Sequence, residues 1–140
     1  MIRNIVAVVV GLIVGMAFNM CVVILNTEVL YPVPEGYDWN DSEMVADYFA
    51  GLPVTAFLIV IVAHIGQAFF GGLVAAAISR NAAMVVAMIV GVFTLIGGVL
   101  NMMMIPNPAW MWIEMPLCLL AAYLAARIIL ARRMAAPETT

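Results

Sequence analysis

Four apolar stretches, each long enough to cross a lipid bilayer as a helix, dominate this sequence. They cover residues 4–26, 53–79, 82–105 and 109–132, and a bilayer core needs only about 20 apolar residues per helix. The chain is 67% apolar and 9% charged, whereas about 25% of residues are charged in an ordinary soluble protein. We therefore expect an integral membrane protein in a lipid bilayer, folded as a single membrane domain over residues 1–140.

The connections between the stretches predict how the helices are arranged. The turn at Arg80 and Asn81 is so short that only an antiparallel hairpin fits it. The predicted fold is therefore all-α, a four-transmembrane-helix antiparallel bundle. The one long connection is an outer loop over residues 27–52. Within this loop, Asn40 followed by Glu43 predicts a helix N-cap box, and the apolar residues after it share one helical face. This pattern predicts a short amphipathic helix on the outer membrane surface.

Charged residues fall at opposite ends of the predicted bundle. All basic residues lie on one side of the membrane if the helices alternate, namely Arg3, Arg80, Arg127, Arg132 and Arg133. The positive-inside rule then predicts a multi-pass protein of the cell inner membrane, bacterial in type, with both termini cytoplasmic. The outer loop instead carries acids: Glu28, Glu35, Asp38, Asp41, Glu43 and Asp47. No basic patch is present for nucleic acid, so we expect no nucleic-acid partner.

The first stretch also needs to be distinguished from a secretory signal, because Arg3 precedes an apolar run. It is longer than a signal's apolar region, and no small-residue cleavage site follows it. We interpret it as an uncleaved helix.

Small residues recur at spacings that let helix backbones approach one another. Gly11 and Gly15 form a G-x-x-x-G pattern, which is typical of close helix contacts in membranes. We expect the helix-packing positions to be Gly11, Gly15, Gly71, Gly72, Gly97 and Gly98. Packing within one chain is favoured over homodimerisation, because a four-helix bundle already needs such contacts. A homo-oligomer or a partner membrane protein stays open.

A few polar residues interrupt the apolar stretches and form a candidate intramembrane polar site: Asn19, His64, Gln67, Asn101 and Glu114. Depth along the helices predicts that Asn19, Asn101 and Glu114 converge in the outer third of the bundle. One interpretation is structural, because hydrogen bonds between membrane helices contribute about 0.6 kcal/mol each. The other is a pocket or path open to the outside, in which Glu114 exchanges a proton or binds a cation.

Metal and cofactor binding find little support in the sequence. Three M-x-x-x-M pairs could offer thioethers to Cu(I), namely Met16/Met20, Met84/Met88 and Met111/Met115. Methionine is, however, a common filler of irregular cores, which we favour here. The single histidine, His64, cannot supply a pair of haem ligands within one chain. We expect no cofactor, no metal site and no enzymatic activity, since no nucleophile lies at the depth of His64.

Several short motifs resemble those of a group of small bacterial four-span membrane proteins to which no activity is attached. The motifs span most of the chain: Tyr31-Pro-Val-Pro-Glu-Gly36, Leu52-Pro53, Asn101 with Ile105-Pro-Asn-Pro-Ala-Trp110, and Ala122-Tyr-Leu-Ala-Ala-Arg127. The group often has histidine where Asn107 stands, and this difference weakens any metal site at that turn. The resemblance implies the four-span fold and topology, and no function.

Two functions from different classes follow from these patterns. The first is a non-enzymatic accessory or structural membrane protein, favoured because the polar residues are few and scattered. The alternative is a small transporter or an ion- or ligand-binding channel that uses Glu114 and His64. The two differ in whether the polar side chains only bond one another or surround a space.

Overall fold

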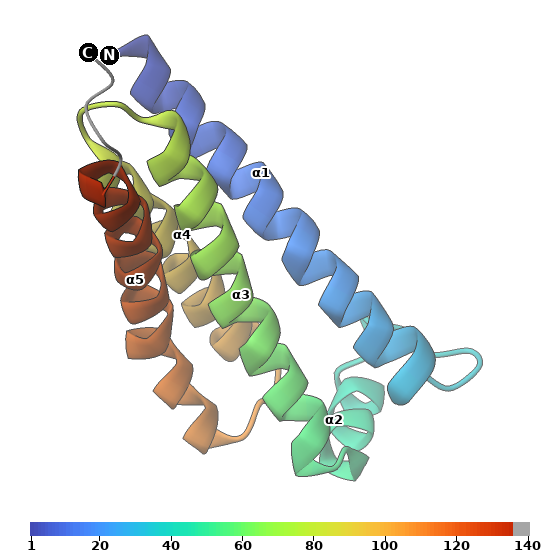
Figure 1. Cartoon of the computed structure of the whole chain (residues 1–140). Coiled ribbons are helices and arrows are strands. Elements are labelled where there is room, and N and C mark those ends of the chain that lie inside the picture. Colours follow the sequence, from blue (N-terminus) through green and yellow to red (C-terminus); the bar gives the residue numbers. More distant parts are fainter. Residues whose placement is uncertain (136–140) are drawn as a thin grey trace.

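The computed structural model describes residues 1–135 and confirms the all-α fold (Figure 1). Residues 136–140 of the predicted domain lie outside the described residues. Four helices are long and apolar enough to cross a membrane, which makes this a multi-pass membrane protein. The long helices are α1 (Ile2–Ile24), α3 (Val54–Ile78), α4 (Ala83–Met104) and α5 (Glu114–Ala135), and the short helix is α2 (Ser42–Gly51).

Two of the long helices have irregular ends. A π-helical turn, Leu25–Leu30, extends α1, and a 3₁₀ turn, Ala109–Ile113, precedes α5. The α-helical part of the last span therefore begins later than the predicted residue 109. Pro116 lies in the first turn of α5, where backbone N–H groups have no intrahelical partner, so its missing N–H costs no helical hydrogen bond.

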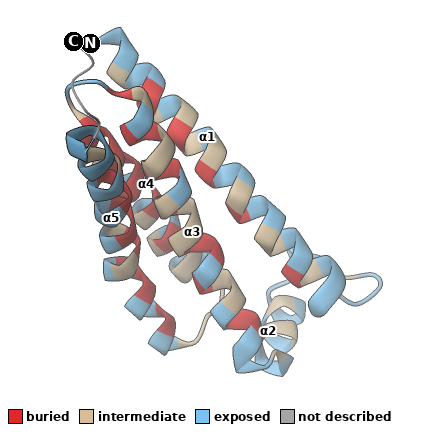
Figure 2. Ribbon diagram, in the orientation of Figure 1, coloured by how far each residue is buried: buried red, intermediate tan, exposed pale blue. Residues whose placement is uncertain are grey.

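Helix α3 is the centre of the bundle, because it packs against α1, α4 and α5 (Figure 1). Helix α1 lies along α3 at the edge of the molecule. Only 11% of the residues in its apolar window are buried, compared with 39–44% in the other three spans. Buried positions face between the helices in Figure 2, while the outward faces are exposed and apolar. This distribution suits a protein surrounded by lipid.

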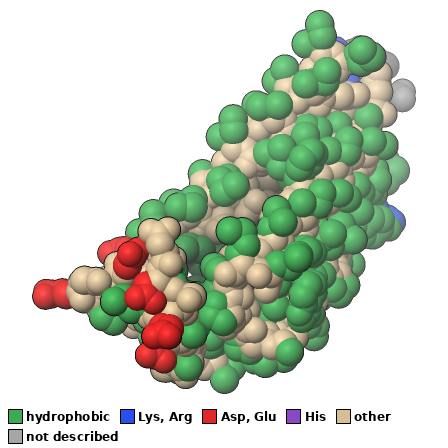
Figure 3. Space-filling model, turned by 180° about the vertical axis from the view of Figure 1, so that it is seen from behind, with side chains coloured by type: hydrophobic (Ala, Val, Ile, Leu, Met, Phe, Trp, Pro, Cys, Tyr) green, Lys and Arg blue, Asp and Glu red, His purple; other side chains and the backbone are tan. Residues whose placement is uncertain are grey.

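Charged side chains divide the molecule into two ends. The start of α1, the turn between α3 and α4, and the end of α5 lie together at one end (Figure 1). We call this the basic end, because the Arg3 and Arg133 side chains donate hydrogen bonds there and Arg80 lies in the turn between α3 and α4. The acids of the loop and α2 gather at the opposite, acidic end (Figure 3).

The half of the bundle next to the basic end is closed by small residues. A Cβ built on Gly11 would lie 2.6 Å from the carbonyl oxygen of Gly71, and one built on Gly71 would lie 2.6 Å from that of Gly11. Backbone therefore touches backbone between α1 and α3. Alanines fill the neighbouring layers, including Ala75 and Ala76 of α3, which are fully buried.

Helix α2 is present where the sequence predicts it, but its cap is one residue later. Asp41, and not Asn40, is the N-cap, and its Oδ1 accepts hydrogen bonds from the backbone N–H groups of Glu43 (2.9 Å) and Met44 (3.2 Å). Asn40 instead donates to Asp38. Asparagine and aspartate are both favoured at N-caps, because the side-chain oxygen of each can accept these bonds. The sequence pattern is therefore compatible with either Asn40 or Asp41 as the cap.

Candidate functional site

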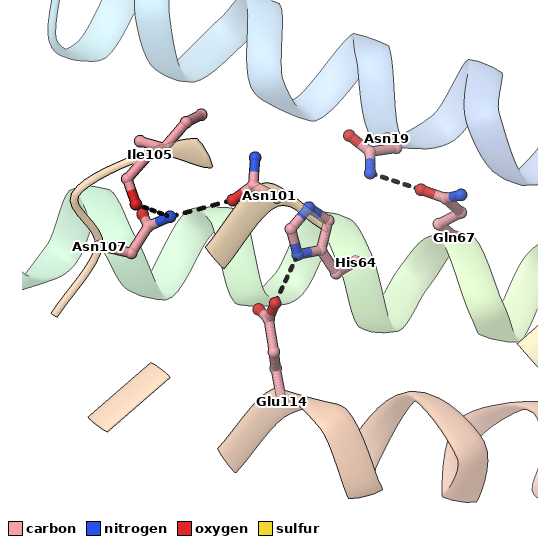
Figure 4. A network of polar contacts seen from close by, with 7 residues as sticks. All are labelled: Asn19, His64, Gln67, Asn101, Ile105, Asn107 and Glu114. Carbon is pink, nitrogen blue, oxygen red and sulfur yellow. Dashed lines mark hydrogen bonds and ion pairs between the residues drawn. The ribbon is translucent and has the colours of Figure 1, made fainter. Parts of the chain in front are cut away.

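The five candidate residues take part in three separate hydrogen-bonded pairs (Figure 4). Nδ1 of His64 lies 2.9 Å from Oε1 of Glu114, and the Asn19 amide donates to the Gln67 side-chain oxygen. The amide of Asn107 donates to Oδ1 of Asn101 at 3.0 Å. Asn19, Asn101 and Glu114, which the sequence predicts to converge, therefore make no hydrogen bond with one another. Each is bonded to a different residue.

The pair of His64 and Glu114 joins α3 to the first residue of α5. Glu114 is fully buried, and His64 is 9% exposed. A carboxylate at a helix N-terminus is favoured by the helix dipole, which helps to hold Glu114 there. Its Oε1 lies 3.4 Å from the point where a Cβ on Gly98 would stand. Its second oxygen, Oε2, is buried without a hydrogen-bond partner among residues 1–135.

A cavity of about 330 Å³ lies between α1, α3 and α4 in the half of the bundle next to the acidic end. Four of the five candidate residues line it, namely Asn19, His64, Gln67 and Asn101, and Glu114 lies behind His64. Side chains of the acidic end also border it, and Figure 3 shows a hollow beside the red acidic patch. The remaining lining residues are Met16, Met20, Val23, Trp39, Phe49, Val60, Thr94, Gly97, Gly98 and Ile105.

The cavity exists because α1 packs along the whole length of α3 but contacts α4 only near the basic end. Near the basic end Ala7 of α1 packs in one cluster with Val90 of α4. Near the acidic end α1 is held to α3, where Asn26 donates to the carbonyl of Ala56 at 3.3 Å. The space between α1 and α4 is therefore left open. Helix α4 adds to it with Gly97, which was expected to pack against another helix but has no atom within 4 Å of a built Cβ.

The other predicted packing glycines lie at helix contacts. Gly11, Gly15 and Gly71 make the close approaches between α1 and α3, because a Cβ built on each would lie 2.6 Å from a carbonyl oxygen of the facing helix. Gly72 faces Ala122 of α5. Gly98 faces Met115, whose terminal methyl would lie 3.2 Å from an added Cβ.

Thr94 is a lining residue that the sequence analysis did not include among the candidates. It is 3% exposed, and its hydroxyl has no hydrogen-bond partner within residues 1–135. A signal for it was present, because positions 94, 98 and 101 are spaced by four and three and so share a helical face with Asn101. Asn107, the partner of Asn101, was also missed as a site residue.

The methionine pairs lie in three different places. Met16 and Met20 line the cavity, whereas Met84 and Met88 line a surface hollow on α4 toward the basic end. Met111 is fully buried near the start of α5. Within residues 1–135 no three His, Cys, Asp or Glu side chains form a metal-binding group.

The mouth of the cavity is acidic and aromatic. Trp39 and Phe49 line the cavity, and the acids Asp38 and Asp47 lie close to them in the sequence. Hydrogen bonds from Asn40, first from its backbone and then from its side chain, lower the pKa of Asp38 below its ordinary value, so this carboxylate stays charged. Burial raises the pKa of the nearby Tyr48 hydroxyl, which donates to the carbonyl of Tyr31 at 2.7 Å.

Comparison with protein-family models, with curated proteins and with solved structures gives no match for this chain. The resemblance drawn from the short motifs therefore stays a prediction.

Proposed function

We propose that this protein is a non-enzymatic binding or transport protein of the inner membrane, which admits a small molecule to the cavity from the outer side. The observation that carries the proposal is a cavity within the membrane-spanning region that is lined by four polar side chains, Asn19, His64, Gln67 and Asn101, and has the buried His64–Glu114 pair in its wall. Polar side chains are costly to hold in an apolar membrane interior, so a space lined by them is suited to a polar occupant.

The arrangement of charges supports an orientation with both termini in the cytoplasm. The arginines lie toward the basic end, and positive residues are retained on the cytoplasmic side of membranes. The cavity lies nearer the acidic end and would then face the outside. The half of the bundle next to the basic end is closed by contacts such as that between Gly11 and Gly71. A molecule would thus enter and leave at the acidic end in this conformation.

The cavity favours this function over the accessory role that the sequence alone favours. That role was based on polar residues being scattered, but four of them border one space. Binding is favoured over catalysis because the one hydrogen bond of the His64 ring within residues 1–135 goes to Glu114, so no nucleophile is bonded to it.

Cysteine labelling in membranes tests the proposal. The native thiols, Cys21 and Cys118, are first replaced by alanine. Gly97→Cys then places a thiol in the cavity, and Ile96→Cys, which is 48% exposed on the outer face of the same helix, is the control facing lipid. We expect a membrane-impermeant thiosulfonate added from the outer side to label Gly97→Cys and not Ile96→Cys. Absence of labelling at both positions would contradict an outward-facing aqueous cavity.

A further inference from the structure

We infer that the cavity selects an organic monocation, namely an amine or quaternary ammonium with a small apolar group, and that Glu114 supplies the opposing negative charge. This inference rests on the proposed function, because the cation has to reach the cavity from the acidic end.

The distribution of charge favours a cation over an anion. No arginine among residues 1–135 lines the cavity. The chain has five basic residues, all arginines: Arg3 and Arg80 lie at the basic end, and the other three lie in the second half of α5, which leads to that end. Acidic side chains gather beside the hollow (Figure 3). Fields of one sign at a cleft raise the local concentration of ligands of the opposite sign. An anion would meet repulsion at the mouth and no basic partner inside.

Glu114 lies where it can act on a cation in the cavity. His64 and Gly98 both line the cavity and separate it from the carboxyl group. Because Gly98 has no side chain, the wall at this point is only backbone, and Oε1 of Glu114 lies 3.4 Å from the position of a Cβ. A buried carboxylate with one unpaired oxygen, Oε2, is costly unless a positive charge lies near it.

The lining offers acceptors for an ammonium group. The Asn19 amide uses its N–H to reach Gln67, so its oxygen is left to accept. The second ring nitrogen of His64 points away from Glu114, toward the side where Asn19 and Asn101 lie (Figure 4), and it is an acceptor in the tautomer whose Nδ1–H donates to Glu114. Both atoms can accept a hydrogen bond from a protonated amine, whereas a quaternary ammonium has no N–H and would be held by its charge and by aromatic contacts.

The remaining lining suits an apolar group beside the positive charge. Trp39 and Phe49 border the mouth, and aromatic faces attract ammonium ions. Met16, Met20 and Val60 provide an apolar wall. The volume of about 330 Å³ lies at the lower end of the range for small-molecule sites, so the ligand must be small.

The experiment compares two thiosulfonates of similar size and opposite charge on Gly97→Cys in the cysteine-free background. One transfers a trimethylammonium-ethyl group and the other a sulfonato-ethyl group, and each rate is divided by that reagent's rate with a free thiol in solution. We expect the cationic reagent to react about tenfold faster. A preference below about threefold would overturn the inference.

Two variants locate the source of the preference. Glu114→Gln keeps the shape of the side chain and its ability to bond His64, and we expect it to reduce the preference at least by half. Glu43→Gln removes an exposed acid of α2 that lies outside the cavity lining, and should reduce it less. An equal effect of the two variants would overturn the role of Glu114.

Protection by free ligands gives a measurement that does not depend on how Glu114→Gln folds. Benzyltrimethylammonium, benzyl alcohol and phenylacetate are tested for slowing the reaction of Gly97→Cys with an uncharged thiosulfonate. We expect protection by the cation alone, and equal protection by all three would overturn the inference. If no reagent reaches Gly97→Cys, the proposed function fails as well, whereas equal reaction of both charges refutes only the choice of a cation.

Discussion

The hydroxyl of Thr94, which is buried, differs from that of the half-buried Thr27 in whether it makes a hydrogen bond. Thr27 donates to the carbonyl of Val23 one turn earlier, at 3.1 Å, which is a common arrangement for threonine in helices. The hydroxyl of Thr94 is buried and bonds to no atom of residues 1–135. A group that gains nothing from the fold is retained at a cost unless something else bonds to it. Removing this hydroxyl should therefore cost the fold little.

Thr94→Val tests this directly, because valine has nearly the same shape and no hydroxyl. We expect the free energy of unfolding in detergent to stay the same or rise by up to about 1 kcal/mol, since an unpaired buried polar group is removed. A loss of stability above about 1 kcal/mol would show that the hydroxyl has a partner within the protein.

Helix α1 depends on close backbone contact with α3, because few of its residues are buried. The contact at Gly11 and Gly71 leaves no room for a side chain on either residue. Gly97 is also a glycine within a helix, α4, but a Cβ added to it would meet no atom of a neighbouring element within 4 Å. Alanine substitution at Gly11 and at Gly97 therefore distinguishes the effect of packing on stability from the effect of helix propensity.

Gly11→Ala should therefore lower the free energy of unfolding by about 1–3 kcal/mol, because its Cβ would lie 2.6 Å from the Gly71 carbonyl oxygen. Gly97→Ala should leave stability unchanged or raise it slightly, since alanine favours helix more than glycine does. Thermal unfolding in one detergent measures both. Equal effects of the two substitutions would mean that α1 does not pack on α3 at Gly11.

Helix α2 depends on the Asp41 cap. Asp41→Ala should destabilise the first turn by about 1 kcal/mol, since the N–H groups of Glu43 and Met44 lose their acceptor. Hydrogen exchange at these two amides should become faster. Asn40→Ala is the matched control, because Asn40 bonds to Asp38 and not to the helix, and it should leave both amides unchanged. Faster exchange in Asn40→Ala alone would instead support the cap predicted from the sequence.

The helices could be predicted from the sequence because length and hydropathy alone determine which segments suit a bilayer. The hydrogen-bond partners of the polar residues could not be predicted from the sequence. Depth along a helix follows from residue number, and it placed Asn19, Asn101 and Glu114 at similar levels. Their partners depend on how each helix is rotated and tilted, and the structure places Gln67, Asn107 and His64 opposite them. The cavity likewise results from α1 following α3, which no local pattern encodes.

The whole molecule is asymmetric between its two ends. Toward the acidic end α1 and α4 leave the cavity between them. At the basic end the last carbonyls of α3 accept hydrogen bonds from other helices: Arg3 of α1 donates to Ile78, and Arg133 of α5 donates to Ala76 (2.8 Å) and Ser79 (2.6 Å). These carbonyls have no partner within α3 itself, and the negative end of the helix dipole attracts cations. The arginines thus join three helices at the closed end.

Arg133→Gln tests whether these bonds hold the closed end together. We expect it to lower the free energy of unfolding by about 1–2 kcal/mol, because charged hydrogen bonds to helix-end carbonyls are lost and glutamine is too short to replace them. Arg132→Gln removes the same charge from the preceding residue in the last turn of α5, while the hydrogen bonds from α5 to the end of α3 and the following turn come from Arg133, so it should change stability little. A similar loss in both variants would indicate that total charge matters and not the contacts of Arg133. Labelling of Gly97→Cys from the outer side should persist in Arg133→Gln, because the cavity is formed by α1, α3 and α4 at the other end.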